Sequence, residues 1–124
     1  MSELPLALII EDDEVITEIF SIAVKEAGFE VIVVRDGIQA LKTLGAETPD
    51  LVLLDLHLPG VPGINVLREI RKDPRLAHTR VLIVSADTTQ SEFMRIHADR
   101  ILIKPIGFYA VYETALQMRE EISR

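Results

Sequence analysis

Four apolar segments of this chain are each followed at once by a side chain capable of polar chemistry. Asp55 follows Leu51–Leu54, a run apolar enough to form a strand buried on both faces. The carboxyl end of such a strand is where open α/β sheets bind their ligands. In chain order, the residues that follow the four segments are Glu11 and Asp12, Asp55, Ser85 and Lys104. Carboxylates, a hydroxyl and an amine at one edge can hold a divalent cation and a phosphoryl group.

The carboxylates of Glu11, Asp12 and Asp55 predict a cation site. Two like charges about 4 Å apart repel by about 4 kcal/mol at an effective dielectric constant of about 20. Such a cluster therefore needs a cation or raised pKa values. The chain has no cysteine and no matched histidine pair, so hard oxygen ligands favour Mg²⁺ or Mn²⁺ over zinc. For Asp13 and Glu14 a simpler interpretation is enough, because acids favour a helix amino terminus.

Short apolar runs alternate along the chain with segments of helical periodicity. The expected strands are Leu6–Ile10, Glu30–Val34, Leu51–Leu54, Val81–Val84 and Ile101–Ile103. Since parallel strands need crossovers, and right-handed crossovers place helices on both faces, the pattern predicts a doubly wound (βα)5 fold. We therefore expect an α/β domain with a five-stranded parallel sheet between helices.

Apolar periodicity and capping residues place five helices between these strands. In the first helix Val15, Ile19, Ile22 and Ala23 are expected to face the core, with Ile16, Phe20 and Ala27 widening the stripe. Asp13 is placed to cap this helix and Gly28 to end it. The second helix is expected to begin at Asp36-Gly37 and to end before Gly45, and the third to carry Ile64, Leu67 and Ile70. The fourth is expected at Thr88–Ala98 as a short and weaker element, and the fifth at Phe108–Ile122.

Composition bounds the class of protein. A length of 124 residues, 48 % of them apolar, fits a single globular domain, residues 1–124, without an effector domain. The net charge of −7 argues against direct binding of nucleic acid or of an anionic membrane surface. No segment resembles a signal peptide or reaches the roughly 20 apolar residues of a membrane span. The absence of cysteine is compatible with a cytoplasmic location.

Five motifs occur in a fixed order along nearly the whole chain. They are Ile9-Ile10-Glu11-Asp12-Asp13, Leu53-Leu54-Asp55-Leu56-His57-Leu58-Pro59, Gly63, Val84-Ser85-Ala86 and Lys104-Pro105. Together they resemble the receiver domain of two-component response regulators, whose fold is the CheY-like form of the flavodoxin-like architecture. The resemblance implies a phosphorelay signalling module rather than an enzyme with an external substrate.

The resemblance implies a role for each residue of the predicted site. Asp55 would accept a phosphoryl group from a phosphohistidine of a histidine kinase or a histidine phosphotransfer protein. Asp12, Asp55 and the backbone carbonyl of His57 would bind Mg²⁺ (or Mn²⁺), and Glu11 would assist through water. The three residues expected to surround the phosphoryl group are Ser85 and Lys104, which would contact it, and Ala86, which would leave room for it.

Two further expectations concern the loop residues near this site. Pro105 follows Lys104, and a Lys–Pro bond at a strand end can be cis, which serves tight local geometry. His57 lies two residues past Asp55. Its side chain is expected either to influence hydrolysis of the acyl phosphate or to be that of a solvent-facing loop residue.

The signalling output is expected on the face formed by the fourth helix, the fifth strand and the fifth helix. Phosphorylation adds about two negative charges, which can draw Ser85 inward and bias that surface toward a protein partner. Ile101 stands where the family usually has Tyr or Phe, so we expect a shift of the loop and fourth helix instead of an aromatic rotamer change. The interval from Ser85 to Lys104 is also short for the family. The active form is expected to be a monomer or a phosphorylation-dependent dimer.

Three other functions compete with phosphorylation as interpretations of this sequence. A flavodoxin-like cofactor binder would need a phosphate loop where the acidic Glu11–Glu14 lies. A phosphohydrolase with an aspartyl-phosphate intermediate would need an Asp-x-Asp pattern after the first strand, which Asp12-Asp13-Glu14 does not supply. The remaining alternative is a receiver-like interaction module that acts without phosphorylation, which Ile101 leaves open.

Overall fold

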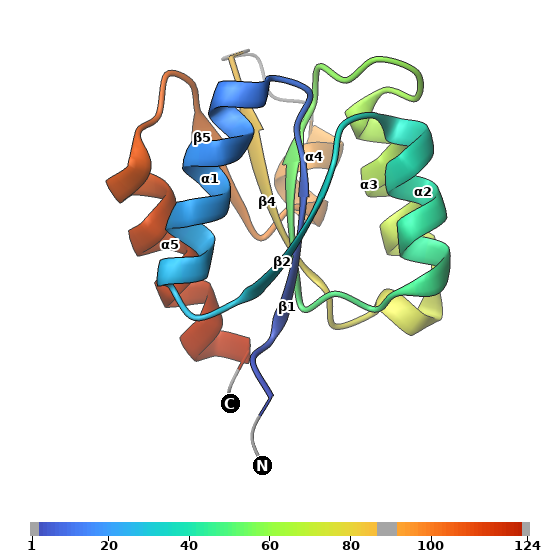
Figure 1. Cartoon of the computed structure of the whole chain (residues 1–124). Helices are drawn as coiled ribbons and strands as arrows, with labels where there is room; N and C mark the ends of the chain where they lie inside the picture. The colour runs from blue at the N-terminus through green and yellow to red at the C-terminus, as the bar shows by residue number, and fades with distance from the viewer. Residues whose placement is uncertain (1–2, 87–91, 123–124) are drawn as a thin grey trace.

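The chain forms a three-layer α/β structure, seen in a computed structural model that describes residues 3–86 and 92–122 (Figure 1). All five strands are parallel, in the order β2-β1-β3-β4-β5. The strands are β1 (Leu6–Ile10), β2 (Glu30–Val34), β3 (Leu51–Asp55), β4 (Arg80–Ser85) and β5 (Arg100–Ile103). The helices are α1 (Glu14–Glu26), α2 (Gly37–Ala46), α3 (Gly63–Lys72), α4 (Glu92–His97) and α5 (Phe108–Ile122), with a 3₁₀ turn η1 at Pro74–Leu76. The predicted doubly wound (βα)5 fold is confirmed.

The sheet is covered on both faces, as its apolar sequence requires. Helices α1 and α5 lie on one face, and α2, α3 and α4 lie on the other (Figure 1). Alternate strand residues enter the two cores: Leu51 and Leu53 pack under α1 and α5, whereas Val52 and Leu54 pack toward α2 and α3. The expected strands Leu6–Ile10, Leu51–Leu54 and Val81–Val84 are apolar throughout, and they form the interior strands β1, β3 and β4, since only interior strands are enclosed on every side.

The core-facing stripe predicted for α1 is partly wrong. Val15, Ile19 and Ile22 are exposed, with 67 %, 37 % and 48 % of their surface accessible. The buried face is instead rotated along the helix and consists of Thr17, Phe20, Ala23 and Val24, followed by Ala27. The reason is that α1 packs against α5 as well as the sheet, and Phe20, Ala23 and Ala27 share a core with Val111 and Ala115. Both sets have helical spacing, so periodicity alone did not separate them.

Local capping rules place the ends of the first two helices. The Asp13 side chain accepts a hydrogen bond from the Ile16 N–H (2.8 Å), and the Asp36 side chain accepts one from Gln39 (2.8 Å). Gly28 follows α1 with a φ of +100°, which favours glycine. Helix α2 continues through Gly45 to Ala46, two residues past its expected end. Of the helix expected at Thr88–Ala98, residues 88–91 lie outside the described part of the chain, and α4 is the shortest of the five α-helices there.

The loop between β3 and α3 is held close to the sheet by a glycine. A Cβ on Gly63 would lie 2.6 Å from the Asp55 carbonyl oxygen and 2.6 Å from the Leu56 Cα, both backbone atoms. The Gly63 N–H donates to the Leu56 carbonyl (3.2 Å), which closes the turn. Only glycine therefore allows α3 to begin directly against the backbone of Asp55.

Among the described helices, none is both long and apolar enough to cross a bilayer.

This close approach makes a stability prediction. Gly63→Ala should lower the free energy of unfolding by about 1–3 kcal/mol, because the new methyl group meets backbone that can move only with the sheet. Equilibrium urea unfolding followed by circular dichroism measures the change. Gly45→Ala is the matched control, since nothing lies within 4 Å of its Cβ position and alanine favours a helix. Equal stability of the two variants would contradict this account of the turn.

Candidate functional site

The carboxyl edge of the sheet brings together the acidic residues and the lysine that the sequence singled out. Glu11 and Asp12 follow β1, Asp55 ends β3, and Lys104 follows β5. One carboxylate oxygen each from Glu11, Asp12 and Asp55 lies within 4.8 Å of the others. Residues separated by up to 93 positions in the sequence therefore form one cluster, as the parallel topology predicts.

Asp55 lies at the carboxyl end of β3 with little exposed surface. Only 4 % of its side chain is accessible to solvent. Its Oδ1 accepts a hydrogen bond from the His57 backbone N–H (3.1 Å), and its Oδ2 lies 3.5 Å from the Lys104 Nζ. The carboxylate is thus oriented through both oxygens, by the loop after β3 and by the residue after β5.

The Lys104 ammonium lies between two buried carboxylates. Its Nζ donates to Glu11 Oε1 (3.0 Å) and ion-pairs with Asp55 Oδ2 (3.5 Å). Burial alone would lower the pKa of Lys104, but the hydrogen bond to Glu11 and the charges of Asp55 and Glu11 outweigh it, and the pKa is raised. The lysine therefore stays protonated and supplies the cation that a buried acidic pair needs.

Glu11 is the most deeply buried acid of the cluster, with 1 % of its side chain exposed. Burial raises the pKa of its carboxyl group, and the charge of Asp55 acts in the same direction. The hydrogen bonds from the Asp13 N–H (3.1 Å) and from Lys104 oppose this shift. Both expected responses to crowded acids, a raised pKa and a neighbouring cation, are present here.

The donor set fits a hard divalent cation. Both Glu11 oxygens already accept hydrogen bonds, from Lys104 and from the Asp13 N–H. Asp12 is exposed at the rim, and one of its carboxylate oxygens lies within 4.8 Å of an oxygen of Asp55. Carboxylate oxygens alone, without sulfur or imidazole in the cluster, suit Mg²⁺ or Mn²⁺. Asp12 and Asp55 would be direct ligands, and the engaged Glu11 would act through water.

Ser85 and its neighbours line the other side of the site. Ser85 is buried at the end of β4, and its carbonyl accepts the Lys104 N–H (2.7 Å). Ala86 is exposed, and Ala86, Lys104 and Pro105 share one cavity beside α1. The Lys104–Pro105 peptide bond is cis, as the sequence allowed. Ser85, Ala86 and Lys104 therefore all lie at the carboxyl edge of the sheet, and their contact with a phosphoryl group stays a prediction.

The structure places two further residues on which the sequence raised expectations, His57 and Ile101. The His57 side chain is exposed, and its backbone N–H already serves Asp55. The roles predicted for its carbonyl and its imidazole stay predictions. Ile101 is partly buried and packs toward the core that contains Met94 of α4. An aliphatic side chain therefore lies between β5 and α4 at the position of the usual aromatic residue.

Two features near the site were not foreseen from the sequence. The buried Thr17 hydroxyl donates to the Glu11 carbonyl (3.2 Å), which fixes the backbone of the acidic segment against α1. A mostly apolar cavity of about 370 Å³ also adjoins Lys104, lined by Ile16, Ile19, Phe20, Ala86, Lys104, Pro105 and Ile106. A threonine on a helix and an exposed isoleucine carry no sequence signal for either role.

Comparison with known proteins assigns the chain to a family. Residues 7–115 match the response regulator receiver domain family. The polar-differentiation response regulator DivK of Brucella anthropi is 32 % identical over 110 residues, which cover 86 % of this chain and 89 % of DivK.

Solved structures agree on the fold. A CheY-like receiver domain from Methylobacillus flagellatus superposes with a TM-score of 0.84 at 26 % identity, covering 94 % of this chain and 99 % of that one. The receiver domain of the sensor histidine kinase PA1611 from Pseudomonas aeruginosa, solved with magnesium in its active-site cleft, gives 0.83 at 22 % identity, covering 95 % and 99 %.

The acidic rim yields a prediction on metal binding. Asp12→Asn should weaken Mg²⁺ binding about tenfold or more, measured by isothermal titration calorimetry, because it removes a direct ligand. Asp13→Asn removes the same charge one residue away and keeps the helix cap, since asparagine caps as well as aspartate. It should weaken binding far less. An equal loss in both variants would show that Asp12 acts only through its charge.

Proposed function

This chain belongs to the response regulator receiver domains, and we propose that Asp55 is the residue at which it accepts a phosphoryl group. The observation that carries the assignment is the pairing of the buried Asp55 carboxylate with Lys104 at the carboxyl edge of the sheet (3.5 Å). A phosphohistidine on a histidine kinase or a histidine phosphotransfer protein would be the donor. A phosphohistidine suits this role because the transfer needs a positioned nucleophile and a cation beside it.

The reaction forms one bond and breaks one. An Asp55 carboxylate oxygen bonds to phosphorus as the phosphorus–nitrogen bond of the donor breaks, and the imidazole nitrogen keeps the electron pair. Lys104 offsets the charge that gathers on the phosphoryl oxygens, as a point charge already aimed at Asp55. Ser85 donates a hydrogen bond to one of these oxygens, and the small Ala86 leaves them room. The His57 N–H holds the other carboxylate oxygen in place.

A divalent cation is part of the proposal. When bound, Mg²⁺ would neutralise the crowded carboxylate and phosphoryl oxygens and align them for transfer. Asp12 and Asp55 would hold it directly, with the His57 carbonyl, and Glu11 would reach it through water. The magnesium in the PA1611 receiver domain supports this assignment by analogy, and Mn²⁺ would fit the same ligands.

The chain is a signalling module of the two-component type. We propose that it turns over no external metabolite and that its own chemistry is limited to phosphorylation from the donor and hydrolysis of the acyl phosphate. A cytoplasmic location, and a monomer or a phosphorylation-dependent dimer, complete the proposal.

An apolar surface beside the acceptor supports docking of the donor. Val15 and Ile19 are exposed on α1, and Ile19 lines the cavity that also contains Lys104 and Pro105. A donor whose phosphohistidine reaches Asp55 must cover this neighbourhood. We propose that apolar side chains of the donor protein occupy it, because a contiguous apolar patch next to a charged site marks a protein interface.

The output partner would bind on a surface separate from the exposed apolar side chains of α1. We propose that it uses the face of α4, β5 and α5, where Tyr109 is 74 % exposed. Acyl phosphate formation would move the segment after Ser85, and Ile101 under α4 would transmit the change without an aromatic rotamer.

The assignment of Asp55 predicts the outcome of labelling with acetyl phosphate. With Mg²⁺, intact-mass analysis should show one phosphoryl adduct on the wild type, no adduct on Asp55→Asn, and an adduct on the control Asp13→Asn. Omitting Mg²⁺ should abolish labelling of the wild type. Absence of an adduct, together with failure to bind beryllium fluoride, would favour the interaction module that acts without phosphorylation.

The donor surface makes a separate prediction. Ile19→Glu should lower the rate of labelling by a protein phosphohistidine donor about tenfold, because it places a charge in the apolar contact. Labelling by acetyl phosphate, which needs no protein contact, should stay unchanged. Tyr109→Glu is the control, since it charges an exposed aromatic residue on the proposed output face. If both variants slow the protein donor equally, the donor does not dock at α1.

A further inference from the structure

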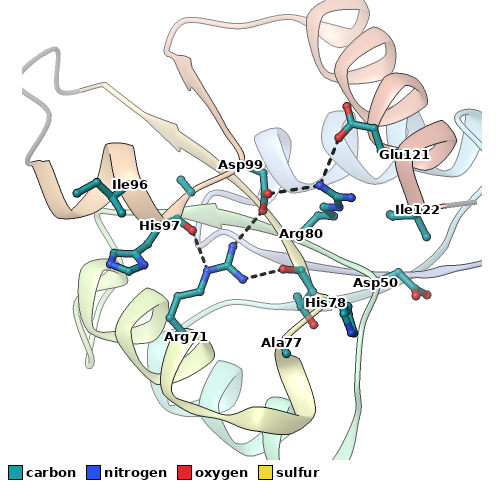
Figure 2. A pocket seen from close by; sticks show the side chains of 12 residues that line it. Asp50, Arg71, Ala77, His78, Arg80, Ile96, His97, Asp99, Glu121 and Ile122 are labelled. Atoms are coloured by element: carbon teal, nitrogen blue, oxygen red, sulfur yellow. Dashed lines mark hydrogen bonds and ion pairs between the residues drawn. The ribbon is translucent and has the colours of Figure 1, made fainter. Parts of the chain in front are cut away.

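The edge of the sheet opposite Asp55 carries a polar pocket built from four elements and their loops. Figure 2 shows the pocket, whose cavity of about 560 Å³ is lined chiefly by charged and polar side chains. Arg71 comes from α3, Arg80 from β4, Asp99 from the turn between α4 and β5, and Glu121 from α5. None of these residues takes part in the proposed phosphoryl transfer.

Arg71 joins three separate segments through one guanidinium group. Its Nε donates to the His97 carbonyl (2.8 Å), and its two terminal nitrogens donate to the Thr79 carbonyl (2.9 Å) and to Asp99 Oδ2 (3.0 Å) (Figure 2). His97 is the last residue of α4, so its carbonyl has no helical partner and is satisfied by this arginine. Arg71 therefore ties the carboxyl end of α4 to α3 and to the start of β4.

Asp99 fixes the same end of α4 to the sheet. Its backbone N–H donates to the Val81 carbonyl (2.9 Å), and its Oδ2 accepts the Val81 N–H (2.7 Å). The residue two positions after α4 is thus bonded to β4 in both directions. With 20 % and 24 % of their side chains exposed, Arg71 and Asp99 form a partly buried pair. Loss of either partner would leave hydrogen-bonding groups unsatisfied.

Alternating charges extend this connection to α5. Arg80 lies 3.7 Å from Asp99 Oδ1 and 3.6 Å from Glu121 Oε1, and Glu121 also pairs with Arg100. The basal network, defined as Arg71, Asp99, Arg80, Glu121 and Arg100, therefore links α3, β4, β5 and α5 at one edge. Networks of this kind hold geometry better than isolated surface pairs.

The rest of α4 is held much less firmly. Met94 is its one buried residue among those described. Phe93 is only partly buried against the same core, and the Arg68 guanidinium of α3 lies 5.1 Å from its ring centre. Few buried apolar contacts mean a low free energy of local rearrangement. Helix α4 thus has one end fixed by several hydrogen bonds and a body held by little apolar packing.

We propose that the basal network is a fixed base about which α4 turns when Asp55 is phosphorylated. The carboxyl end of α4 and the start of β5 then keep their positions in both states, and the displacement grows toward Glu92. Arg71 is the positioning residue of this device, because three different nitrogens of its planar guanidinium reach three separate acceptors, whereas a lysine has a single nitrogen. The inference rests on the function proposed above for Asp55.

Nuclear magnetic resonance of the whole chain tests the proposal, with beryllium fluoride and Mg²⁺ as the probe for the phosphorylated state. In the wild type, the backbone amides of Glu92–Met94 should shift on complex formation. The Arg71 Nε–H and the amides of Val81 and Asp99 should change their hydrogen-exchange rates by less than about twofold.

Two variants locate the effect at the network. Arg71→Lys should still form the complex, but exchange of the Ala98 and Asp99 amides should rise about tenfold or more. Arg68→Lys is the matched control on the same helix, since lysine keeps a cation beside Phe93, and it should behave as wild type. Asp99→Asn, which retains an acceptor for Val81 and loses the charge, should give the same loosening if Arg71→Lys does not fold.

The outcomes separate this inference from the function on which it rests. A complex in which the Arg71 Nε–H or the Asp99 amide loses protection would overturn the fixed base and leave phosphorylation of Asp55 intact. Wild-type exchange in both Arg71→Lys and Asp99→Asn would overturn it equally. If the wild type forms no complex at all, the proposed function fails and this inference fails with it.

Discussion

The ion pairs of the Lys104 ammonium with Glu11 and Asp55 are the interactions on which the arrangement of the site depends. Parallel strands necessarily bring their carboxyl ends to one edge, and three of those ends carry ionisable groups with little exposed surface. Acids in such a place repel one another and lose their hydration. Lys104, which follows β5, offsets the repulsion and the lost hydration of these acids. The same positive charge lies where a phosphoryl group would arrive. Stability of the apo protein and readiness for chemistry thus have a common origin.

The two edges of the sheet differ in how their charged side chains are arranged. At the carboxyl edge the charges are concentrated in a small space, with an exposed acid and an open rim, so the arrangement can accept a cation and an additional anion. At the amino edge the charges alternate, and each arginine is matched by carboxylates or by carbonyls. A matched network gains nothing from a further charge. We infer that the amino edge keeps its arrangement on phosphorylation because its charges are already matched.

The glycine at position 63 and the face chosen by α1 show how packing sets what the site can do. Because α3 begins against the backbone of Asp55, the proposed acceptor lies beside a short, closed turn. Because α1 turns Phe20 and Ala23 inward, Ile19 is left beside the reactive edge. A surface suitable for a protein donor is therefore a by-product of how the core was filled.

Much of this protein follows from the sequence alone. Apolar runs, helix caps and the side chains after each run predicted the strand positions, the doubly wound fold and the composition of the site, because these depend on short-range patterns and on the fixed direction of parallel strands. Tertiary structure alone decided which of two equally periodic stripes on α1 is buried, since Phe20 fits against α5 and Val15 does not reach it. It also decided that Glu11 pairs with Lys104 and that Arg71 meets Asp99, 28 residues away. Such pairings depend on the distances between packed elements, and no local pattern in the chain encodes them.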